Sequence, residues 1–291
     1  MNTEQKKWFF LFLLALTWGS SFILIKKGLL GLSPLQLGSL RTVMSSLFIF
    51  IIGYKSLKTI QNHQWKWIVI TGFLGTFFPS FLFAFAETEV DSGVVSILNS
   101  LVPLNTILIG LAVFKITSTK TQVFGVILGF IGASMLIFNS MELHPDQNYL
   151  YAGFVVLATV MYASSVNIIK YYLQDVKPIA IATGNFVAIV IPAVLVLSFS
   201  NFFTAETFQN ETIYMSIGCV VILSLFGTVM AKIIFNTLIQ LSSPVFASSV
   251  AYLMPLVALL WGLLDGEVFG LNQGLASLLI LLGVYLVNKK A

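Results

Sequence analysis

Long apolar runs separated by short polar breaks make up almost the whole chain. Each run holds about 20 residues, and an α-helix of that length crosses roughly 30 Å of hydrocarbon. Three breaks place a proline where the first helical turn tolerates it: Ser33-Pro34, Lys177-Pro178 and Ser243-Pro244. The pattern predicts an all-α membrane protein with ten transmembrane helices, at residues 8–29, 34–53, 66–86, 91–114, 122–139, 149–172, 178–199, 212–238, 244–264 and 270–288.

The chain contains one pattern twice. A motif near the N-terminus recurs 144 positions later, as Trp18-Gly19-Ser20-Ser21, Lys26, Pro34 and Arg41 against Tyr162-Ala163-Ser164-Ser165, Lys170, Pro178 and Asn185. A second set recurs 152 positions later, as Gly75-Thr76, Pro103 and Gly110 against Gly227-Thr228, Pro255 and Gly262. We therefore expect two repeats of five helices each, residues 1–140 and residues 145–291.

Five helices per repeat is an odd number, so the second repeat enters the membrane in the opposite direction to the first. Many secondary transporters are built from such inverted repeats and hold their substrate near the middle of the membrane, at the interface between the repeats. The repeat therefore indicates a transporter that works by alternating access.

The lysines outside the runs indicate the orientation of the chain. They fall in alternate connections, whereas the opposite connections carry Asp and Glu; the lysines are Lys6, Lys7, Lys55, Lys58, Lys66, Lys115, Lys120, Lys177, Lys289 and Lys290. Cytoplasmic loops are enriched in Lys and Arg, so we expect both termini in the cytoplasm of a bacterial cell and the protein in its inner membrane. The first run is too long for a signal peptide and lacks an A-x-A site, so we expect no cleavage.

Composition excludes a soluble domain. The chain is 58% hydrophobic and only 9% charged, whereas soluble domains carry roughly 25% charged residues. The net charge of +4 is spread over short loops, so we expect no nucleic acid partner. One cysteine, Cys219, and two histidines in different loops provide no disulfide or metal site, and we expect no cofactor. The expected partners are a small-molecule substrate and the lipid bilayer, and the oligomeric state is open between monomer and homodimer.

Polar residues recur at helical spacing within several runs. In the fourth, sixth and eighth runs they share a helix face, as Ser92, Ser96, Asn99, Pro103 and Thr106; as Thr159, Ala163, Asn167 and Lys170; and as Ser224, Thr228, Lys232 and Asn236. Such faces either join helices by hydrogen bonds or line a water-filled cavity. Packing is the usual role of Ser and Thr, and both roles stay open for the asparagines.

Basic residues inside the runs are a sharper signal. Arg41 and Lys232 lie deep in their runs, where a buried cation without a partner costs at least ~2.5–3.5 kcal/mol. We therefore predict that both face a cavity and meet an anionic group of a substrate. Lys26 and Lys170 lie near helix ends, where their ammonium groups can also reach the lipid headgroups.

Acidic residues and prolines complete the pattern. No Asp or Glu lies near the middle of a run, which argues against tight proton coupling, although Glu87 at a loop end can still take that role. Pro103 and Pro255 occupy matching places in the fourth and ninth runs. Each interrupts backbone hydrogen bonding, so we predict bends there that shape the cavity or a gate.

These residues resemble the EamA family of the drug/metabolite transporter superfamily. The resemblance covers nearly the whole chain. It is carried by Trp18-Gly19-Ser20-Ser21-Phe22 with Lys26, Ser33-Pro34, Arg41, Asn99-Ser100-Leu101-Val102-Pro103-Leu104, Gly227-Thr228 with Ala231, Tyr252-Leu253-Met254-Pro255, Gly262 and Glu267. It implies inverted five-helix halves around a central cavity and export or exchange of metabolites. Lys115 and Lys232 depart from the family pattern, and a cation at Lys232 changes what the cavity accepts.

We predict a transporter of small polar metabolites that are amino-acid-like, anionic or zwitterionic. The predicted substrate-binding residues are Trp18, Ser21, Arg41, Asn99, Tyr162, Asn167, Lys170, Asn185, Thr228, Lys232, Asn236 and Tyr252, with Pro103 and Pro255 as hinges. The alternative within transport is efflux of hydrophobic drug-like cations, which the basic residues disfavour. An intramembrane enzyme lacks the required nucleophile–base or metal groups, and a scaffold has no need of buried cations.

Overall fold

The computed structural model describes residues 2–115, 118–143, 148–264 and 271–288, and within these ranges every regular element is helical. Eight helical rods are long and apolar enough to cross a membrane. They are Thr3–Gly28, Pro34–Thr59, Asn62–Ala86, Ser92–Phe114, Ala152–Tyr172, Pro178–Phe199, Ile213–Leu241 and Pro244–Leu264. All eight coincide with predicted runs, so the multi-pass architecture is confirmed.

Several rods consist of more than one element. In the first half these are α1 (Thr3–Gly28), α2 (Pro34–Gly53) with η1 (Tyr54–Thr59), α3 (Asn62–Gly72) with η2 (Phe73–Phe77) and α4 (Phe78–Ala86), and α5 (Ser92–Leu98) with η3 (Asn99–Leu101) and α6 (Val102–Phe114). In the second half they are η4 (Tyr149–Tyr151) with α8 (Ala152–Tyr172), α9 (Pro178–Phe199), α11 (Ile213–Ile222) with η5 (Leu223–Met230) and α12 (Ala231–Leu241), and α13 (Pro244–Ser248) with α14 (Val250–Leu264). The short α10 (Ala205–Gln209) lies in the loop before α11.

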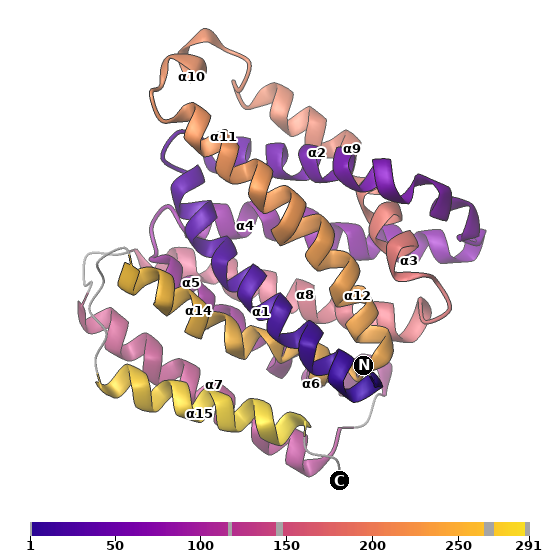
Figure 1. The fold of residues 1–291 in the computed structure, drawn as a ribbon, viewed down its shortest axis with the longest axis vertical. Coiled ribbons are helices and arrows are strands. Elements are labelled where there is room, and N and C mark those ends of the chain that lie inside the picture. The colour runs from indigo at the N-terminus through magenta and orange to yellow at the C-terminus, as the bar shows by residue number, and fades with distance from the viewer. Residues whose placement is uncertain (1, 116–117, 144–147, 265–270, 289–291) are drawn as a thin grey trace.

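The two remaining predicted runs, 122–139 and 270–288, correspond to α7 (Lys120–Leu143) and α15 (Leu271–Asn288). The apolar stretches that the structure describes within these two helices are 10 to 17 residues long, so a ten-span count stays a prediction. Figure 1 shows the two helices side by side at one edge of the molecule. A Cβ atom on Gly283 would lie 2.6 Å from the Gly129 nitrogen, so this pair of helices needs a glycine there to approach closely.

Helix starts follow the proline signals. Ser33 Oγ accepts a hydrogen bond from the Gln36 backbone nitrogen, and Gln36 Oε1 accepts one from the Ser33 nitrogen, which together form a capping box ahead of α2. Pro34 then occupies the first turn, where its missing N–H is not needed. Ser243 Oγ caps α13 by accepting a hydrogen bond from the Phe246 backbone nitrogen at 3.1 Å, and Pro244 follows in the first turn.

The first rod of each half packs against rods of the other half. The first rod of the first half, α1, packs against α11, α12 and α14, which are the third and fourth rods of the second half. The first rod of the second half, α8, packs in turn against α3, α4 and α6 of the first half. This reciprocal arrangement is the one expected from two copies of one unit, and it places an interface between the halves at the centre of the molecule (Figure 1).

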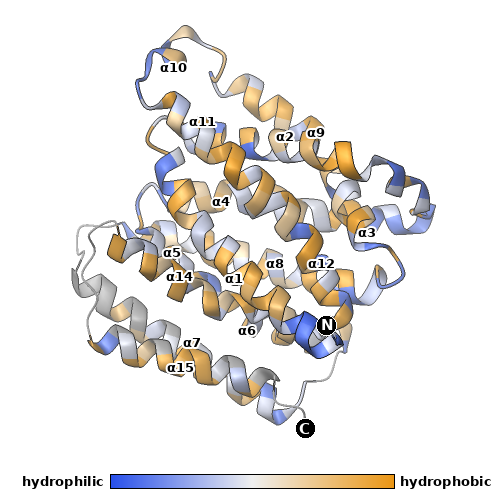
Figure 2. Cartoon of the chain, viewed as in Figure 1, coloured by the Kyte–Doolittle hydropathy of each residue, from blue (hydrophilic) through white to orange (hydrophobic). Residues whose placement is uncertain are grey.

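The distribution of polarity is that of a protein dissolved in lipid. Large apolar side chains such as Phe199, at 85% exposure, and Leu16, at 56%, face outward, whereas many Ser, Thr and Asn side chains are buried. Figure 2 shows apolar residues along the rods and polar residues concentrated at their ends. Buried polar groups in such a protein need hydrogen-bond partners inside it, and these partners define the site described next.

Candidate functional site

One π-helical segment interrupts the third rod of each half. The two segments are η2 (Phe73–Phe77) and η5 (Leu223–Met230), and they contain the two Gly-Thr pairs that recur 152 positions apart. A π-helical turn widens the helix and is often found at functional sites. Here the carbonyl oxygens of Gly75 and Gly227 both accept hydrogen bonds from side chains of the opposite half.

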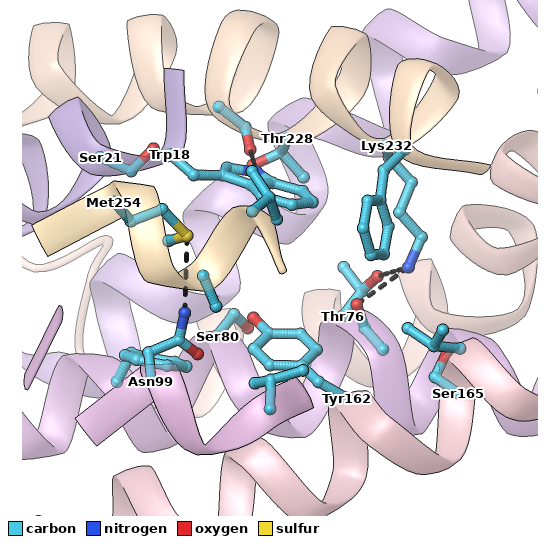
Figure 3. Close-up of a pocket in the computed structure, with 18 of the residues that line it drawn as sticks. Trp18, Ser21, Thr76, Ser80, Asn99, Tyr162, Ser165, Thr228, Lys232 and Met254 are labelled. Carbon is cyan, nitrogen blue, oxygen red and sulfur yellow. Dashed lines mark hydrogen bonds between the residues drawn. The ribbon is translucent and has the colours of Figure 1, made fainter. Parts of the chain in front are cut away.

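A cavity lies between the halves, beside both π segments (Figure 3). Its water-accessible volume is about 120 Å³, roughly tenfold the minimum that holds one water molecule. Residues of both halves line it, and its wall combines aromatic and aliphatic side chains with a few polar groups. The space therefore suits a small molecule with an apolar body and a small number of polar groups.

Lys232 brings the first cation to the cavity. Its side chain is 8% exposed, and Nζ donates to the Gly75 carbonyl oxygen and to Thr76 Oγ1, both at 2.9 Å. Figure 3 shows the ammonium group reaching from its helix toward Thr76. An ammonium group has three donors, so one of them remains for a ligand.

Arg41 brings the second cation. Its Nε donates to Thr228 Oγ1 at 2.9 Å, and Thr228 Oγ1 donates in turn to the Leu223 carbonyl oxygen at 3.0 Å. A guanidinium has five donors in a planar fork, which matches a carboxylate or phosphate group. Among the described residues, Nε is the guanidinium nitrogen of Arg41 that donates a hydrogen bond. The two terminal nitrogens of the guanidinium are therefore available to a ligand.

Aromatic side chains form another part of the wall. The Trp18 Nε1 donates to the Gly227 carbonyl oxygen at 2.8 Å, which fixes the indole against η5, and its ring meets Phe235 edge to face at 4.9 Å. Tyr162, the repeat counterpart of Trp18, lies 6.0 Å from Phe83, measured between ring centroids. Ser21 also lines the cavity.

Two asparagines present acceptors. Asn99 Nδ2 lies 3.6 Å from Met254 Sδ, and Asn236 Nδ2 donates to the Pro178 carbonyl oxygen at 3.3 Å. Both Oδ1 atoms are buried and have no hydrogen-bond partner among the described residues. The cavity wall therefore combines two cationic side chains with two neutral amides whose oxygen atoms are unpaired.

The structure places two other predicted asparagines outside this cavity. Asn167 Nδ2 donates to the carbonyl oxygens of Thr106 and Ala163, both at 3.0 Å. Asn185 Nδ2 donates to the Ile68 carbonyl oxygen at 2.6 Å and to Thr71 Oγ1 at 2.9 Å. Neither belongs to the cavity wall, and both join neighbouring helices.

Lys170 and Tyr252 also lie away from the cavity wall. Lys170 Nζ donates to three carbonyl oxygens at the end of α12, and the shortest bond reaches Ser242 at 2.7 Å. A cation at the C-terminus of a helix stabilises its last turn. The Tyr252 hydroxyl donates to the Val126 carbonyl oxygen of α7 at 3.3 Å, so this side chain points to a neighbouring helix.

The two prolines lie near breaks in their helices. Pro103 follows the short 3-10 segment η3, and Pro255 lies inside α14, which begins after a break at Ser249. Asn99 and Ser248, at the two breaks, both line the cavity. Both breaks therefore contribute residues to the cavity wall, and the bends and the hinge role stay predictions. Glu267 of the family pattern lies outside the described residues.

The cavity also contains residues that the sequence analysis did not select. Three of them, Thr76, Ser80 and Phe83, are the counterparts of Thr228, Lys232 and Phe235 at the 152-residue spacing. The repeat itself was therefore the signal that identifies them.

Comparison with known proteins adds the following matches. The model of the EamA-like transporter family matches residues 5–138 and 150–289. An uncharacterized transporter of Archaeoglobus fulgidus is 28% identical over 294 residues, with 98% of this chain and 100% of that protein covered. The uncharacterized inner membrane transporter YedA of Escherichia coli is 27% identical, with 96% and 89% covered. One protein crystal structure shares the fold, with a TM-score of 0.73 at 14% identity over 96% of this chain and 95% of that one.

Proposed function

Since the chain belongs to the EamA-like transporter family, we propose that it is a secondary transporter of small polar metabolites that carry a carboxylate or phosphate group. Family membership weighs against an intramembrane enzyme. The observation that carries the proposal is the pair of cations, the half-buried Arg41 and the buried Lys232, which line one cavity and have donors to spare.

The electrostatics support an anionic group in the substrate. Each cation is held by neutral oxygens, and among the described residues no carboxylate forms an ion pair with either one. An anion between them gains charge-assisted hydrogen bonds in a site with little water, where such bonds are strong. Specificity for a negative group follows from this arrangement.

The neutral acceptors extend the proposal to zwitterions. The free Oδ1 atoms of Asn99 and Asn236 can accept from an ammonium or hydroxyl group. The aromatic wall at Trp18 and Phe235 accommodates an apolar body. An amino acid with an apolar side chain has all three features, so amino-acid-like compounds are the substrates we favour.

We further propose ten spans in two inverted halves, with both termini in the cytoplasm of a bacterial cell and the protein in its inner membrane. Two transport states then arise when the halves rock about the cavity. The packing of α1 and α8 supports this mechanism. Each is the first rod of its half, and each packs against the third and fourth rods of the other half.

The test is transport by the purified protein in proteoliposomes. We expect counterflow of labelled L-amino acids and no transport of tetraphenylphosphonium, a lipophilic cation. Lys232→Met should reduce the amino-acid counterflow, whereas Lys170→Met, which changes a lysine outside the cavity, should leave its substrate selectivity unchanged. Transport of tetraphenylphosphonium alone, increased by Lys232→Met, would favour cation efflux and refute the proposal.

A further inference from the structure

A buried carboxylate lies at the end of the third rod. Glu87 directly follows Ala86, the last residue of α4, and its backbone nitrogen donates to the Phe83 carbonyl oxygen at 2.9 Å. Both carboxylate oxygens are buried and have no hydrogen-bond partner among the described residues. Glu87 also stands at the C-terminus of a helix, where the dipole disfavours a negative charge.

The charges around Glu87 come from three neighbouring rods. Arg41 on α2 and Lys26 on α1 attract its carboxylate, and Tyr162 on α8 interacts with Arg41. Glu89 and Asp91 are the next acidic residues of the same loop. Burial outweighs the attraction of the two cations and raises the pKa of Glu87 well above its usual value.

Arg41 connects Glu87 to the cavity. It is the strongest cationic neighbour of Glu87 and also part of the cavity wall. If a ligand carboxylate binds Arg41 while Glu87 is ionised, two anions share one guanidinium in a site of low dielectric constant. Like charges that share a site favour protonation of one of them, and Glu87 is already the group that burial disposes to bind a proton.

We propose that Glu87 is the proton-binding group of the transporter, linked through Arg41 so that an anionic ligand and a proton occupy the protein together. The inference rests on the proposed function, because it requires an anionic group at Arg41. The proton joins the Glu87 carboxylate from solvent and leaves to solvent, and the ligand carboxylate forms only hydrogen bonds. Linkage is reciprocal, so the ligand must raise proton affinity by the factor by which the proton raises ligand affinity.

The first experiment locates the proton without a ligand. Infrared difference spectra of the purified protein, recorded between acidic and alkaline pH, should contain the C=O band of a protonated carboxyl group that titrates above the usual range of glutamate. The band should be absent from Glu87→Gln and present in Glu89→Gln, which changes an exposed residue of the same loop. Identical spectra for wild type and Glu87→Gln would overturn the proposal.

The second experiment measures the linkage with two probes of similar shape, phenylacetate and phenethylammonium. As the pH rises through the titration of Glu87, the affinity of wild type for phenylacetate should fall by up to about tenfold per pH unit, the limit for one linked proton. Glu87→Gln should lose this dependence, Glu89→Gln should keep it, and phenethylammonium should not weaken with rising pH.

The outcomes separate this inference from the proposed function. Phenylacetate binding with the same pH profile in wild type and Glu87→Gln overturns the proton linkage and leaves the anion site intact. Failure of wild type to bind phenylacetate at any pH, with phenethylammonium bound instead, overturns the anion site and the linkage together.

Discussion

Replacing Lys232 by methionine tests whether its ammonium group serves a ligand or only the fold. The change removes two hydrogen bonds, to the Gly75 carbonyl oxygen and to Thr76 Oγ1. Bonds from a charged donor contribute about 1.5–3 kcal/mol each. Methionine has a similar length and relieves the burial of a cation, which costs several kcal/mol. These effects oppose each other, so we expect the free energy of unfolding to change by only about 2 kcal/mol or less.

The expected loss in ligand binding is larger and has no such compensation. A ligand carboxylate that loses one charge-assisted hydrogen bond loses about 1.5–3 kcal/mol, or about 10- to 150-fold in affinity. The matched control is Lys170→Met, because Lys170 also donates to backbone carbonyl oxygens but lies outside the cavity. That variant should lose about 1 kcal/mol of stability and bind ligand within about twofold of wild type.

The assay is thermal unfolding of the detergent-solubilised variants with and without phenylacetate, followed by titration calorimetry. Lys232→Met should keep a cooperative transition and lose the stabilisation that phenylacetate gives wild type. The reasoning is refuted if both lysine variants bind phenylacetate equally well, since Lys232 would then act only as a contact between helices.

Three further predictions concern other parts of the protein. Gly75→Ala would place a Cβ 2.5 Å from Ser165 Oγ and 3.0 Å from Lys232 Nζ; both neighbours must shift, so counterflow should fall severalfold and the melting temperature should fall as well. Tyr252→Phe loses one hydrogen bond and should cost about 0.5–1.5 kcal/mol in calorimetric unfolding, with unchanged counterflow. Because the pKa of Glu87 is raised in the folded state, its stabilising contribution is complete below the unfolded pKa of about 4.3 and disappears as the pH rises through the folded value. Melting temperatures across pH should therefore decline more steeply for wild type and Glu89→Gln than for Glu87→Gln.

The spans could be predicted because a membrane imposes a length and a composition on every segment that crosses it. The prolines at positions 34, 178 and 244 fixed helix starts to the residue, since proline is favoured in the first turn. The third rod, in contrast, begins at Asn62 rather than at residue 66, because polar residues of its first turn extend beyond the apolar run.

The site was harder to predict because a polar face on a helix does not show which neighbour it meets. Asn167 and Asn236 looked equivalent in sequence, yet Asn167 joins two helices and Asn236 lines the cavity. The π segments were also not anticipated, because a wider turn at Gly75 or Gly227 leaves no signature in the periodicity of apolar residues. The packing between the halves determines which asparagine lines the cavity and where the π segments form, and no local sequence pattern shows that packing.

The two π segments have a consequence for how the transporter changes state. Trp18 and Arg41 of the first half donate hydrogen bonds to the second half. Lys232 of the second half donates hydrogen bonds to the first half. The two sets of contacts differ in their donors, which are an indole and a guanidinium in one set and an ammonium group in the other. If the halves rock as proposed, releasing one of these two sets of contacts by mutation should shift the balance between the two proposed states by about 1–3 kcal/mol, or roughly 5- to 150-fold.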